Sequence, residues 1–451
     1  MESRSSGQAR RGLSRSRVLS VLSVWAVCSV PCLVIACGDG AGSQWIPIPG
    51  EGGSAGASGE GGEPEDAAAG GASGDGGASG KGGASGKGGA SGKGGGSGKG
   101  GASGEGGAVG EGGASGGVDA GGAGGAPGTP AKTRKIKDLT GPGTSAQQFG
   151  VGGTDLGIAV RQPNGQIAYI FGDTFEQNGV GGPGWRSPVL LRSAPGGLAN
   201  GITFTSAAGG AYAKQILDYS HSSPDYSTWL PTDAITIGGR MYLHFMVNQG
   251  LGNVRWSQIA YSDDNGEHWA LSNARWEGDE NFTLRQLWTW ERGDDGYVYV
   301  LSTSFKRADP IILHRVPEGK LLDKSAYEPW GYKDNAWNWG NPATVVLPGK
   351  FGEMSLRRVE NKWLLAWFNA EDYDITIKVF DGPTSNLHTA KTYKPIKGGA
   401  WGFESDTVVA QLYGGYIHPD STLHELHLIV SQWNTQTNWP YRAMQFITGV
   451  N

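Results

Sequence analysis

The stretch that decides the fold is Gly153–Phe175, GTDLGIAVRQPNGQIAYIFGDTF. Two largely apolar runs flank the turn residues Pro163–Gly165, and this arrangement predicts a β-hairpin. Strands disfavour aspartate, yet Asp155 stands where the first strand begins and Asp173 stands where the second strand ends. The stretch therefore predicts a β fold and places two carboxyl groups at the open end of one hairpin.

The same pattern of strand, polar turn and strand returns four more times along the chain. The further hairpins are Trp229–Asn248, Leu287–Ser304, Phe351–Ala370 and Tyr413–Trp433. No long stretch of this region carries a helical period, so the sequence predicts an all-β fold. Five repeated units about 50–70 residues apart indicate a five-bladed β-propeller, with a double β-sandwich as the alternative.

A short motif between two of these hairpins supports a propeller. Ser262–Trp269, SDDNGEHW, fits the Asp-box pattern S-x-D-x-G-x-x-W, which recurs in sialidase-like propellers. In this motif the aspartate caps a tight turn, the glycine adopts a positive φ and the tryptophan packs beneath the turn. We therefore expect Asp264 to have a structural role and no part in chemistry.

The N-terminal segment has the pattern of a bacterial export signal. An arginine-rich head precedes an apolar run from Val18 to Ala36. The run ends in VIAC, which resembles a lipobox, so we expect residues 1–36 to be a lipoprotein signal peptide and Cys37 to carry the lipid. The mature protein is then an exported bacterial lipoprotein, membrane-anchored at the cell surface or in the periplasm. The alternative is a plain transmembrane anchor with an incidental cysteine.

Residues 37–131 have the composition of a disordered linker. They hold most of the 80 glycines of the chain, in units such as GGASGKGG that offer few side chains to pack. A functional binding repeat is the alternative. Residues 132–451 are long enough for a substantial core and form the predicted propeller domain. All three cysteines, Cys28, Cys32 and Cys37, precede this domain, so we expect no disulfide and no cysteine nucleophile in it.

The two carboxyl groups of the first hairpin suggest acid–base chemistry. If Pro163–Gly165 is a three-residue loop, strand register places Asp155 directly opposite Asp173. A two-residue loop of Asn164 and Gly165 shifts the register by one and separates them, and a bulge would restore either case. Two facing carboxyl groups split their pKa values, so one holds a proton near neutral pH while the other stays charged. Glycoside cleavage needs an acid for the leaving oxygen and a carboxylate for the anomeric carbon or its water. The alternative is two independent capping aspartates.

Other polar residues stand at comparable strand ends. In a propeller the equivalent ends of the innermost strands surround one mouth of the central channel, so Asp233, Glu353 and His418 are expected to converge there. Asp233 and Glu353 are candidates to tune a pKa or to replace one member of the aspartate pair. Arg357 and His418 are candidates to bind hydroxyl groups or to orient a carboxylate. Each residue taken alone is more typical of a turn or a cap.

Tryptophans are further candidates for contact with a substrate. Their rings suit the apolar C–H faces of sugars, although many of them are expected to be core residues. The candidates are Trp185, Trp229, Trp337, Trp339 and Trp401. Trp229, in the same hairpin as Asp233, is the tryptophan that we assign to substrate binding.

Composition and spacing argue against several other functions. The formal net charge is −5 and no basic stripe appears, so nucleic acid is not an expected partner. The eight histidines form no ligand set with suitable spacing, because His424 and His427 sit in a strand-like run and point to opposite faces. We therefore expect no metal and no cofactor, with a structural calcium ion as the alternative.

Six motifs together resemble the family named domain of unknown function 4185. They are GTDLG, FGDTF, SPVLLRS, PTDAI, EMSLR and YGGYIHP. The resemblance spans Gln147 to Phe446 and implies a five-bladed propeller. It also implies membership of glycoside hydrolase family 183, the endo-D-arabinanases that act on mycobacterial arabinogalactan and lipoarabinomannan. By motif, the catalytic pair of that family falls on Asp155 in GTD and Asp173 in FGD.

The resemblance implies cleavage of α-D-arabinofuranosyl bonds in a cell-wall D-arabinan, by an endo-acting enzyme that we expect to be a monomer. A non-catalytic glycan-binding surface lipoprotein on the same scaffold is the first alternative, and it predicts binding without turnover. A structural surface protein that binds another protein is the second alternative, and it predicts a broad apolar patch. Because propellers host all three functions, the fold alone does not decide among them.

Overall fold

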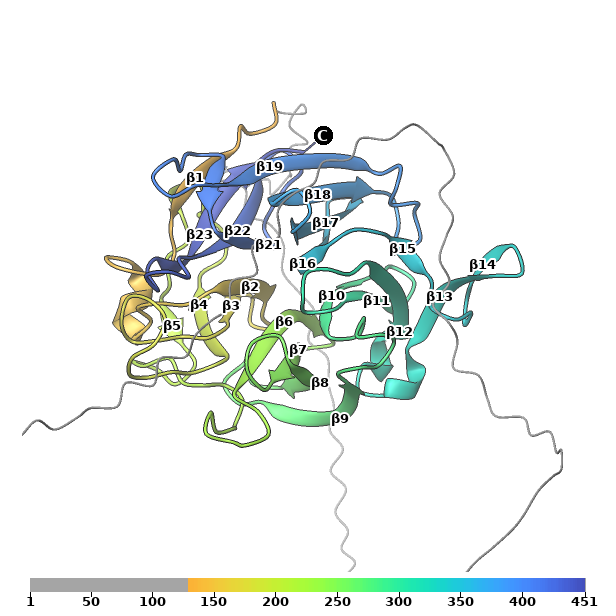
Figure 1. Cartoon of the computed structure of the whole chain (residues 1–451), viewed down its shortest axis with the longest axis horizontal. Coiled ribbons are helices and arrows are strands. Elements are labelled where there is room, and N and C mark those ends of the chain that lie inside the picture. Colours follow the sequence, from red (N-terminus) through yellow and green to blue (C-terminus); the bar gives the residue numbers. More distant parts are fainter. Residues whose placement is uncertain (1–128, 451) are drawn as a thin grey trace, which may run out of the picture. The chain divides into compact units, whose positions relative to one another are not determined.

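The computed structural model describes residues 129–450. The predicted signal peptide, Cys37 and nearly all of the predicted linker lie outside these residues. The described part of the chain contains 23 strands and four short 3-10 helices, and its strands form five sheets arranged in a ring (Figure 1). The predicted all-β, five-bladed propeller is confirmed, and the double β-sandwich is excluded.

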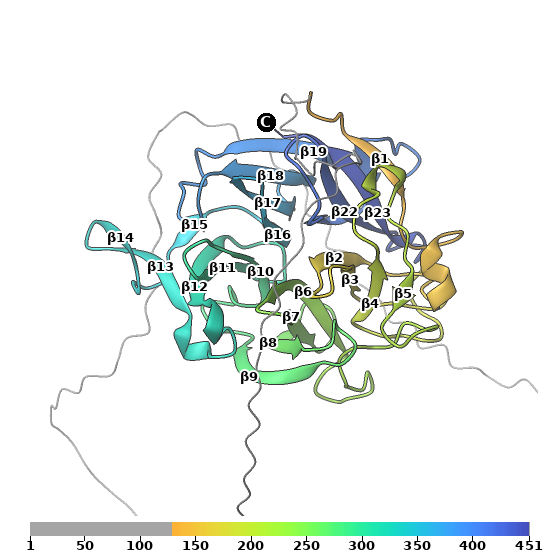
Figure 2. The ribbon, with the colours of Figure 1, turned by 180° about the vertical axis from the view of Figure 1, so that it is seen from behind.

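Each sheet contributes its first strand to the wall of the central channel. The innermost strands are β2 (Leu156–Arg161), β6 (Thr228–Ile237), β10 (Leu287–Arg292), β16 (Phe351–Val359) and β21 (Leu412–Ile417). Each contacts the next, and β21 contacts β2, which closes the ring (Figures 1 and 2). Because every blade begins at its innermost strand and continues outward, residues that begin these strands share one mouth of the channel, and residues that end them share the other.

The second strands complete the five predicted hairpins. They are β3 (Ile167–Phe171), β7 (Arg240–Asn248), β11 (Tyr297–Thr303), β17 (Lys362–Asn369) and β22 (Leu426–Trp433). Each pairs antiparallel with the innermost strand of its own blade. The repeat in the sequence is therefore the inner half of each blade.

The third strands lie between the inner and outer parts of each blade. They are β4 (Val189–Ser193), β8 (Val254–Ser262), β12 (Ile311–Pro317), β18 (Asp374–Phe380) and β23 (Tyr441–Thr448). Both β3 and β4 are buried along their whole length, because neighbouring blades cover both faces of the sheet. This two-sided burial explains why these strands are nearly continuous apolar runs instead of alternating ones.

The outer strands finish the blades, and one of them closes the ring. They are β5 (Ser206–Ala207), β9 (Ala270–Glu277), β13 (Glu328–Lys333), β19 (Lys391–Gly399) and β1 (Arg134–Asp138). Strand β1 comes from the start of the domain and pairs antiparallel with β23 from its end. The last blade therefore joins the two ends of the domain, so neither end can leave without opening the ring.

Shorter elements decorate this framework. They are β14 (Ala336–Trp339), β15 (Val345–Leu347), β20 (Val408–Ala410), η1 (Ser145–Phe149), η2 (Leu198–Asn200), η3 (Glu318–Lys320) and η4 (Lys324–Ala326). Strand β14 pairs with β13 to form a hairpin that projects from the third blade (Figure 1). Among residues 129–450, no helix is long and apolar enough to span a bilayer.

Apolar side chains fill the spaces between the blades. Trp276, Trp288 and Trp290 have almost no exposed surface and pack together where the second and third blades meet. Each large apolar side chain that is fully buried contributes roughly 1.5–3 kcal/mol to folding. Many such contacts hold the blades together in a domain whose sequence contains no cysteine.

The Asp-box forms the turn between β8 and β9. Asp264 Oδ1 accepts hydrogen bonds from the Ser262 hydroxyl (2.8 Å) and the His268 N–H (2.9 Å). Gly266 has a φ of 76°, and its carbonyl accepts the indole N–H of Trp269 at 3.0 Å. The motif therefore has the predicted structural role, and Asp264 serves to cap the turn.

Bulges interrupt the strand pairing in four of the five innermost strands. They lie between Leu156 and Ile158, Pro231 and Asp233, Phe351 and Met354, and Gly414 and Tyr416. A bulge changes the direction of the side chains beside it and is common next to active sites. The first three lie beside or include candidate residues named from the sequence, Asp155, Asp233 and Glu353.

Candidate active site

The hairpin Gly153–Phe175 has the predicted three-residue loop. The Gln162 N–H donates to the carbonyl of Gln166 (2.8 Å), so Pro163–Gly165 alone connects the two strands. Gly165 has a φ of 87°, in the left-handed region that glycine adopts without strain. The turn residues therefore set the register at this end of the hairpin, as predicted.

A bulge in β2 then shifts the pairing at the open end of the hairpin. Leu156 opposes Phe171, and the carbonyl of Asp155 accepts a hydrogen bond from the Gly172 N–H at 3.2 Å. Asp155 is therefore opposite Gly172, and the predicted direct pairing of Asp155 with Asp173 is wrong by one residue. The two carboxyl groups still interact, because the charge of Asp173 is second only to burial in raising the pKa of Asp155.

Asp155 is a half-buried carboxyl group with few hydrogen-bond donors. Its Oδ2 accepts from the Tyr413 hydroxyl (2.9 Å), and its Oδ1 is buried with no hydrogen-bond partner among the described residues. Burial is the main cause that raises the pKa of Asp155 to about 8, and the charges of Asp173 and Glu353 add to it. The hydroxyl groups of Tyr413 and Tyr441 act in the opposite direction. Asp155 therefore holds a proton at neutral pH.

Gly172 allows this carboxyl group to lie against the backbone of β3. A Cβ atom at Gly172 would lie 2.4 Å from Asp155 Oδ1 and 3.1 Å from Cδ1 of Leu156. The first distance is shorter than atoms tolerate and the second is tight, so any larger residue would have to displace the Asp155 carboxyl group. The glycine of the FGD sequence thus has a packing role at the site.

Asp173 is also half-buried, but two donors point at it. Its Oδ1 accepts from the Thr228 hydroxyl (2.6 Å) and from the indole N–H of Trp185 (2.8 Å). Burial is the largest influence and leaves the pKa of Asp173 above its ordinary value, although these two donors and His221 favour the charged form. The two aspartates therefore differ in the number of donors around them, and Asp173 is the better stabilised carboxylate.

A third carboxyl group, that of Glu353 on β16, faces the pair. Its Oε1 forms an ion pair with Nη2 of Arg307, and its Oε2 is buried with no partner among the described residues. The guanidinium carbon of Arg307 lies 5.0 Å from the ring centre of Tyr413. Arg307 thus places one cation beside the carboxyl groups of Glu353 and Asp155. Within residues 129–450, no group of three or more His, Cys, Asp or Glu side chains is arranged to hold a metal ion.

Asp233 and Arg357 form a separate, buried ion pair. The two guanidinium nitrogens Nη2 and Nη1 lie 2.6 and 2.9 Å from the two carboxylate oxygens. Asp233 also accepts from the Thr289 hydroxyl (2.7 Å), the Trp290 N–H (3.1 Å) and the Ala234 N–H (2.8 Å). Asp233 is therefore fully engaged and unavailable to replace either aspartate of the pair. The role of this ion pair is to fasten β6, β10 and β16 together.

His418 lies at the other mouth of the channel. It directly follows β21, whereas Tyr413 is near the start of that strand, so the two are separated by about 16 Å at roughly 3.3 Å per residue. Its Nε2 bonds with the Tyr169 hydroxyl (2.8 Å), and its Nδ1 accepts from the Asp420 N–H (3.0 Å). Burial lowers its pKa to about 3, so His418 is neutral. The expected convergence of His418 with the aspartate pair and Glu353 was wrong, because His418 follows the end of β21, whereas Asp155 and Glu353 lie at or near the start of β2 and β16.

Trp229 is a core residue and offers no surface for a sugar. Its ring is stacked between Tyr219 (4.4 Å between ring centres) and Phe245 (5.2 Å), and only 5% of the residue is exposed. The assignment of Trp229 to substrate binding is therefore wrong. Trp185 differs in both respects, since it is 38% exposed and donates to Asp173.

The remaining candidate tryptophans lie away from the innermost strands. Trp337 and Trp339 are on β14, in the hairpin that projects from the third blade (Figure 1). Trp401 lies in the connection between β19 and β20. None of the three belongs to a strand that lines the channel, so Trp185 is the tryptophan that the fold brings to the aspartates.

Three side chains of the site were absent from the sequence-based prediction. Tyr413 opens the motif YGGYIHP, and Thr228 directly precedes Trp229, so their positions beside quoted motifs were an available signal. Arg307 lies in the connection between β11 and β12 with a φ of 57°, and no local pattern marks it. It reaches the site only because this connection comes close to Glu353 in the folded ring.

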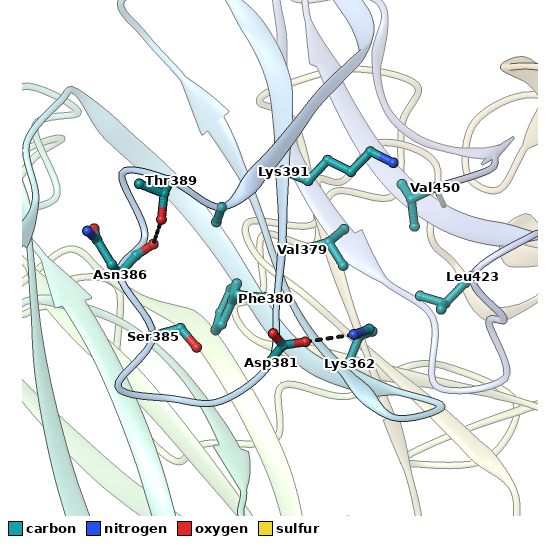
Figure 3. Close-up of a pocket in the computed structure, with 11 residues that line it drawn as sticks. Lys362, Val379, Phe380, Asp381, Ser385, Asn386, Thr389, Lys391, Leu423 and Val450 are labelled. Carbon is teal, nitrogen blue, oxygen red and sulfur yellow. Dashed lines mark hydrogen bonds and ion pairs between the residues drawn. The ribbon is translucent and has the colours of Figure 1, made fainter.

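A cavity of about 490 Å³ lies elsewhere, against the outer part of the fourth blade (Figure 3). Its walls include Phe380, Leu423 and Val450. The one carboxyl group in its lining, that of Asp381, is paired with Lys362 at 2.6 Å. The lining of this cavity therefore has no pair of interacting carboxyl groups, and none of its residues belongs to the first hairpin.

A protein-family model described as "Domain of unknown function (DUF4185)" matches residues 140–447, which is nearly the whole propeller. The chain belongs to the DUF4185 family. Notoamide biosynthesis cluster protein J of Aspergillus sp. (strain MF297-2) is 34% identical over 320 residues, which cover 65% of this chain and 83% of that protein. An uncharacterized 35.9 kDa protein in the asd 3' region of Mycolicibacterium smegmatis is 29% identical over 331 residues, covering 69% and 97%.

Solved structures are similar to this DUF4185 protein at low sequence identity. A candidate hydrolase from Bacteroides ovatus has a TM-score of 0.50 and 14% identity, over 67% of this chain and 86% of that chain. A GH43_1 enzyme from Xanthomonas citri has a TM-score of 0.43 and 12% identity, over 70% and 90%. The likeness to the Bacteroides ovatus protein concerns the fold alone, so the function of this chain has to be argued from its site.

Proposed function

We propose that this DUF4185 protein is a glycoside hydrolase in which Asp155 is the acid and Asp173 is the carboxylate. The observation that supports this assignment is the unequal environment of the two aspartates. Burial raises the pKa of Asp155 to about 8, so it can give a proton at neutral pH. Asp173 accepts hydrogen bonds from Thr228 and Trp185, which favour its charged form. An acid beside a carboxylate is what cleavage of a glycosidic bond requires.

In the proposed reaction the proton of Asp155 moves to the glycosidic oxygen as the bond from that oxygen to the anomeric carbon breaks. Asp173 either takes a proton from the water that attacks the anomeric carbon, or bonds to that carbon itself. In the second case, water that gives its proton to the Asp155 carboxylate then attacks the anomeric carbon and breaks its bond to Asp173. Asp155 is left as a carboxylate, and the Tyr413 hydroxyl at 2.9 Å stabilises that charge. The ion pair of Glu353 with Arg307 keeps a cation beside the site while this charge develops.

We propose α-D-arabinofuranosyl bonds of a cell-wall D-arabinan as the substrate, cut within the chain. The support is the resemblance of the GTD and FGD motifs to the endo-D-arabinanases, together with a relative in Mycolicibacterium smegmatis. The fungal relative belongs to a notoamide biosynthesis cluster, so the family need not share one substrate. Export as a lipoprotein anchored through Cys37 would bring a monomeric enzyme to such a polymer, and no cofactor is part of the proposal.

Analysis of digestion products tests this proposal. The purified full chain would be incubated with mycobacterial arabinogalactan, and with an unrelated polysaccharide such as xylan, and the digests separated by chromatography. Short arabino-oligosaccharides from arabinogalactan alone are the expected result. Release of sugars from another glycan instead would support a hydrolase and would contradict arabinan as its substrate. Binding to a glycan with no release from any polysaccharide would favour the alternative, a non-catalytic glycan-binding lipoprotein.

Gly172→Ala is expected to lower turnover by about 10²-fold, because the new Cβ would displace the Asp155 carboxyl group from its working position. The same overpacking should cost about 1–3 kcal/mol of unfolding free energy. Steady-state kinetics and chemical denaturation measure the two effects.

Gly319→Ala is the matched control for this substitution. Gly319 lies in η3, and a Cβ atom there would meet nothing within 4 Å. Turnover should be unchanged, and the free energy of unfolding should stay within about 0.5 kcal/mol of the wild-type value. Equal turnover by the two variants would contradict the packing of Asp155 against Gly172.

A further inference from the structure

A histidine beside the two aspartates has an unusual pair of hydrogen-bond partners. His221 lies half-buried in the connection before β6, and its Nδ1 is 2.7 Å from the carbonyl oxygen of Ser227. Its Nε2 is 2.9 Å from Oε1 of Gln215. A neutral imidazole has one N–H and one lone pair, so two accepting partners can be satisfied only by the doubly protonated ring. The charge of His221 therefore depends on which way the Gln215 amide points.

The orientation of Gln215 is fixed by its own contacts. Its Nε2 donates to the carbonyl oxygens of Leu217 and Tyr219, both at 2.9 Å. Its Oε1 accepts from the Ser187 N–H at 3.3 Å. The reversed amide would set an oxygen against two carbonyl oxygens and an NH₂ group against an N–H. Oε1 therefore faces His221 and can only accept a hydrogen bond from it.

Two effects oppose each other at His221. Burial is the largest influence and lowers the pKa of His221 below its ordinary value, although the Ser227 carbonyl and the charge of Asp173 raise it. The second accepting partner, Oε1 of Gln215 at 2.9 Å, opposes burial and favours the imidazolium. Loss of the proton would also turn a ring lone pair toward one of the two accepting oxygens, which adds a cost to the neutral form. Asp218 and Asp225, the other carboxyl groups of this connection, are exposed. Asp173 is therefore the charged group from a neighbouring element that acts on the ring.

The ring of His221 also stacks on the tryptophan that donates to Asp173. The ring centres of His221 and Trp185 are 4.0 Å apart, with an angle of 25° between the planes. Phe175 stacks on the same indole at 6.2 Å, which fixes its position. A cation over an indole face is stabilised by the ring, and it draws electron density from the indole N–H. That N–H donates to Asp173 Oδ1 at 2.8 Å, so the charge is transmitted to the carboxylate.

We propose that His221 is held as an imidazolium and acts through Trp185 as a positioning residue that keeps Asp173 ionised. The catalytic consequence rests on the proposed function, in which Asp173 is the carboxylate of the pair. While His221 is charged, Asp173 stays ionised to a lower pH. The fold thus contains a cation that counters the burial of one aspartate and leaves the other protonated.

Nitrogen-15 NMR of the histidine rings in the purified full chain tests the charge without any substrate. His221→Gln assigns the His221 signals by their loss. We expect both ring nitrogens to be protonated at pH 7.5, where an ordinary histidine is neutral. Gln215→Leu removes one acceptor and should lower the titration midpoint of His221 by about one pH unit. A His221 ring with a single N–H at pH 7.5 would overturn the proposal.

The positioning role has its own readout, which also needs no activity. In His221→Gln, the carbon-13 titration midpoint of the Asp173 carboxyl group should rise by about one pH unit. The acidic limb of the pH–rate profile should move upward by the same amount. An unmoved Asp173 midpoint would overturn the positioning role even if His221 proves to be charged. If the wild type cleaves no glycan, the proposed function is contradicted. The two titrations still decide whether His221 is charged and whether it keeps Asp173 ionised.

Discussion

Replacing Asp155 with asparagine should lower the turnover of arabinan by about 10³-fold, because the amide has no proton to give to the leaving oxygen. Asp173→Asn should cause a loss of similar size, because the amide can neither activate water nor bond to the anomeric carbon. Both variants keep the shape of the side chain, so each substitution removes the acidic proton or the negative charge and changes little else. Steady-state kinetics on arabino-oligosaccharides measures both effects.

An aryl α-D-arabinofuranoside distinguishes the roles of the two aspartates. A nitrophenolate leaves without an acid, so Asp155→Asn should recover most of its activity on this substrate. Asp173→Asn should remain inactive on it, because attack at the anomeric carbon still needs the carboxylate. Recovery by Asp173→Asn instead would reverse the two assignments, and no loss in either variant would contradict the aspartate pair altogether.

The pH dependence of stability provides the folding control for Asp155→Asn. Burial raises the pKa of Asp155 from 3.8 to about 8 in the folded protein. Unfolding therefore releases a proton between these values, so the contribution of Asp155 to stability is fully present below pH 3.8 and is lost as the pH rises through 8. The variant should gain stability relative to the wild type as the pH rises from 4 to 8. If the variant is less stable than the wild type throughout this range, its lost activity is explained by misfolding.

Arg357→Met should destabilise the protein by about 3–5 kcal/mol, because it leaves the Asp233 carboxylate buried without its cation. The charge sits where β6, β10 and β16 meet, so the loss affects three blades at once. Chemical denaturation measures the free energy of unfolding. Combining Arg357→Met with Asp233→Asn should recover part of the loss, because the two residues are in direct contact.

Arg358→Met is the matched control for this prediction. Arg358 is the next residue along β16, and it pairs with Asp294, whose side chain is 82% exposed. Exposed pairs of this kind contribute about 0–1 kcal/mol, so the control should change stability little. Similar losses in Arg357→Met and Arg358→Met would contradict a special role for the buried pair.

The sequence was sufficient to predict the propeller, because its inner hairpins are built from local signals. Apolar runs with polar turns mark all five strand pairs, and Pro163–Gly165 sets the loop of the first one. The bulge beside Asp155 was not predictable in this way. Leu156 adopts a φ of 66°, and its N–H donates to the Ser431 hydroxyl of another blade at 2.8 Å. The register at the site is therefore decided by a contact between residues far apart in the sequence.

The same distinction separates the candidate residues that the fold brings together from those that it does not. Glu353 begins an innermost strand and reaches the aspartates, whereas His418 ends one and faces the opposite mouth. The direction of each strand decides which mouth its residues face, once the order of the blades is known. The identity of the residues at strand ends does not predict this by itself. Trp229 is covered on both faces by Tyr219, from the connection before β6, and by Phe245, from the paired strand β7, so its ring offers no surface to a sugar.

The measurement that tests the central claim most directly is a carbon-13 NMR titration of the Asp155 carboxyl group, assigned by its loss in Asp155→Asn. A midpoint near pH 8 is expected, because burial and the neighbouring carboxylates hold the proton on Asp155. That result would establish a proton donor beside the Asp173 carboxylate at neutral pH. A midpoint near pH 4, the ordinary value for aspartate, would leave two charged carboxylates at neutral pH and would contradict the acid role on which the proposed hydrolysis depends.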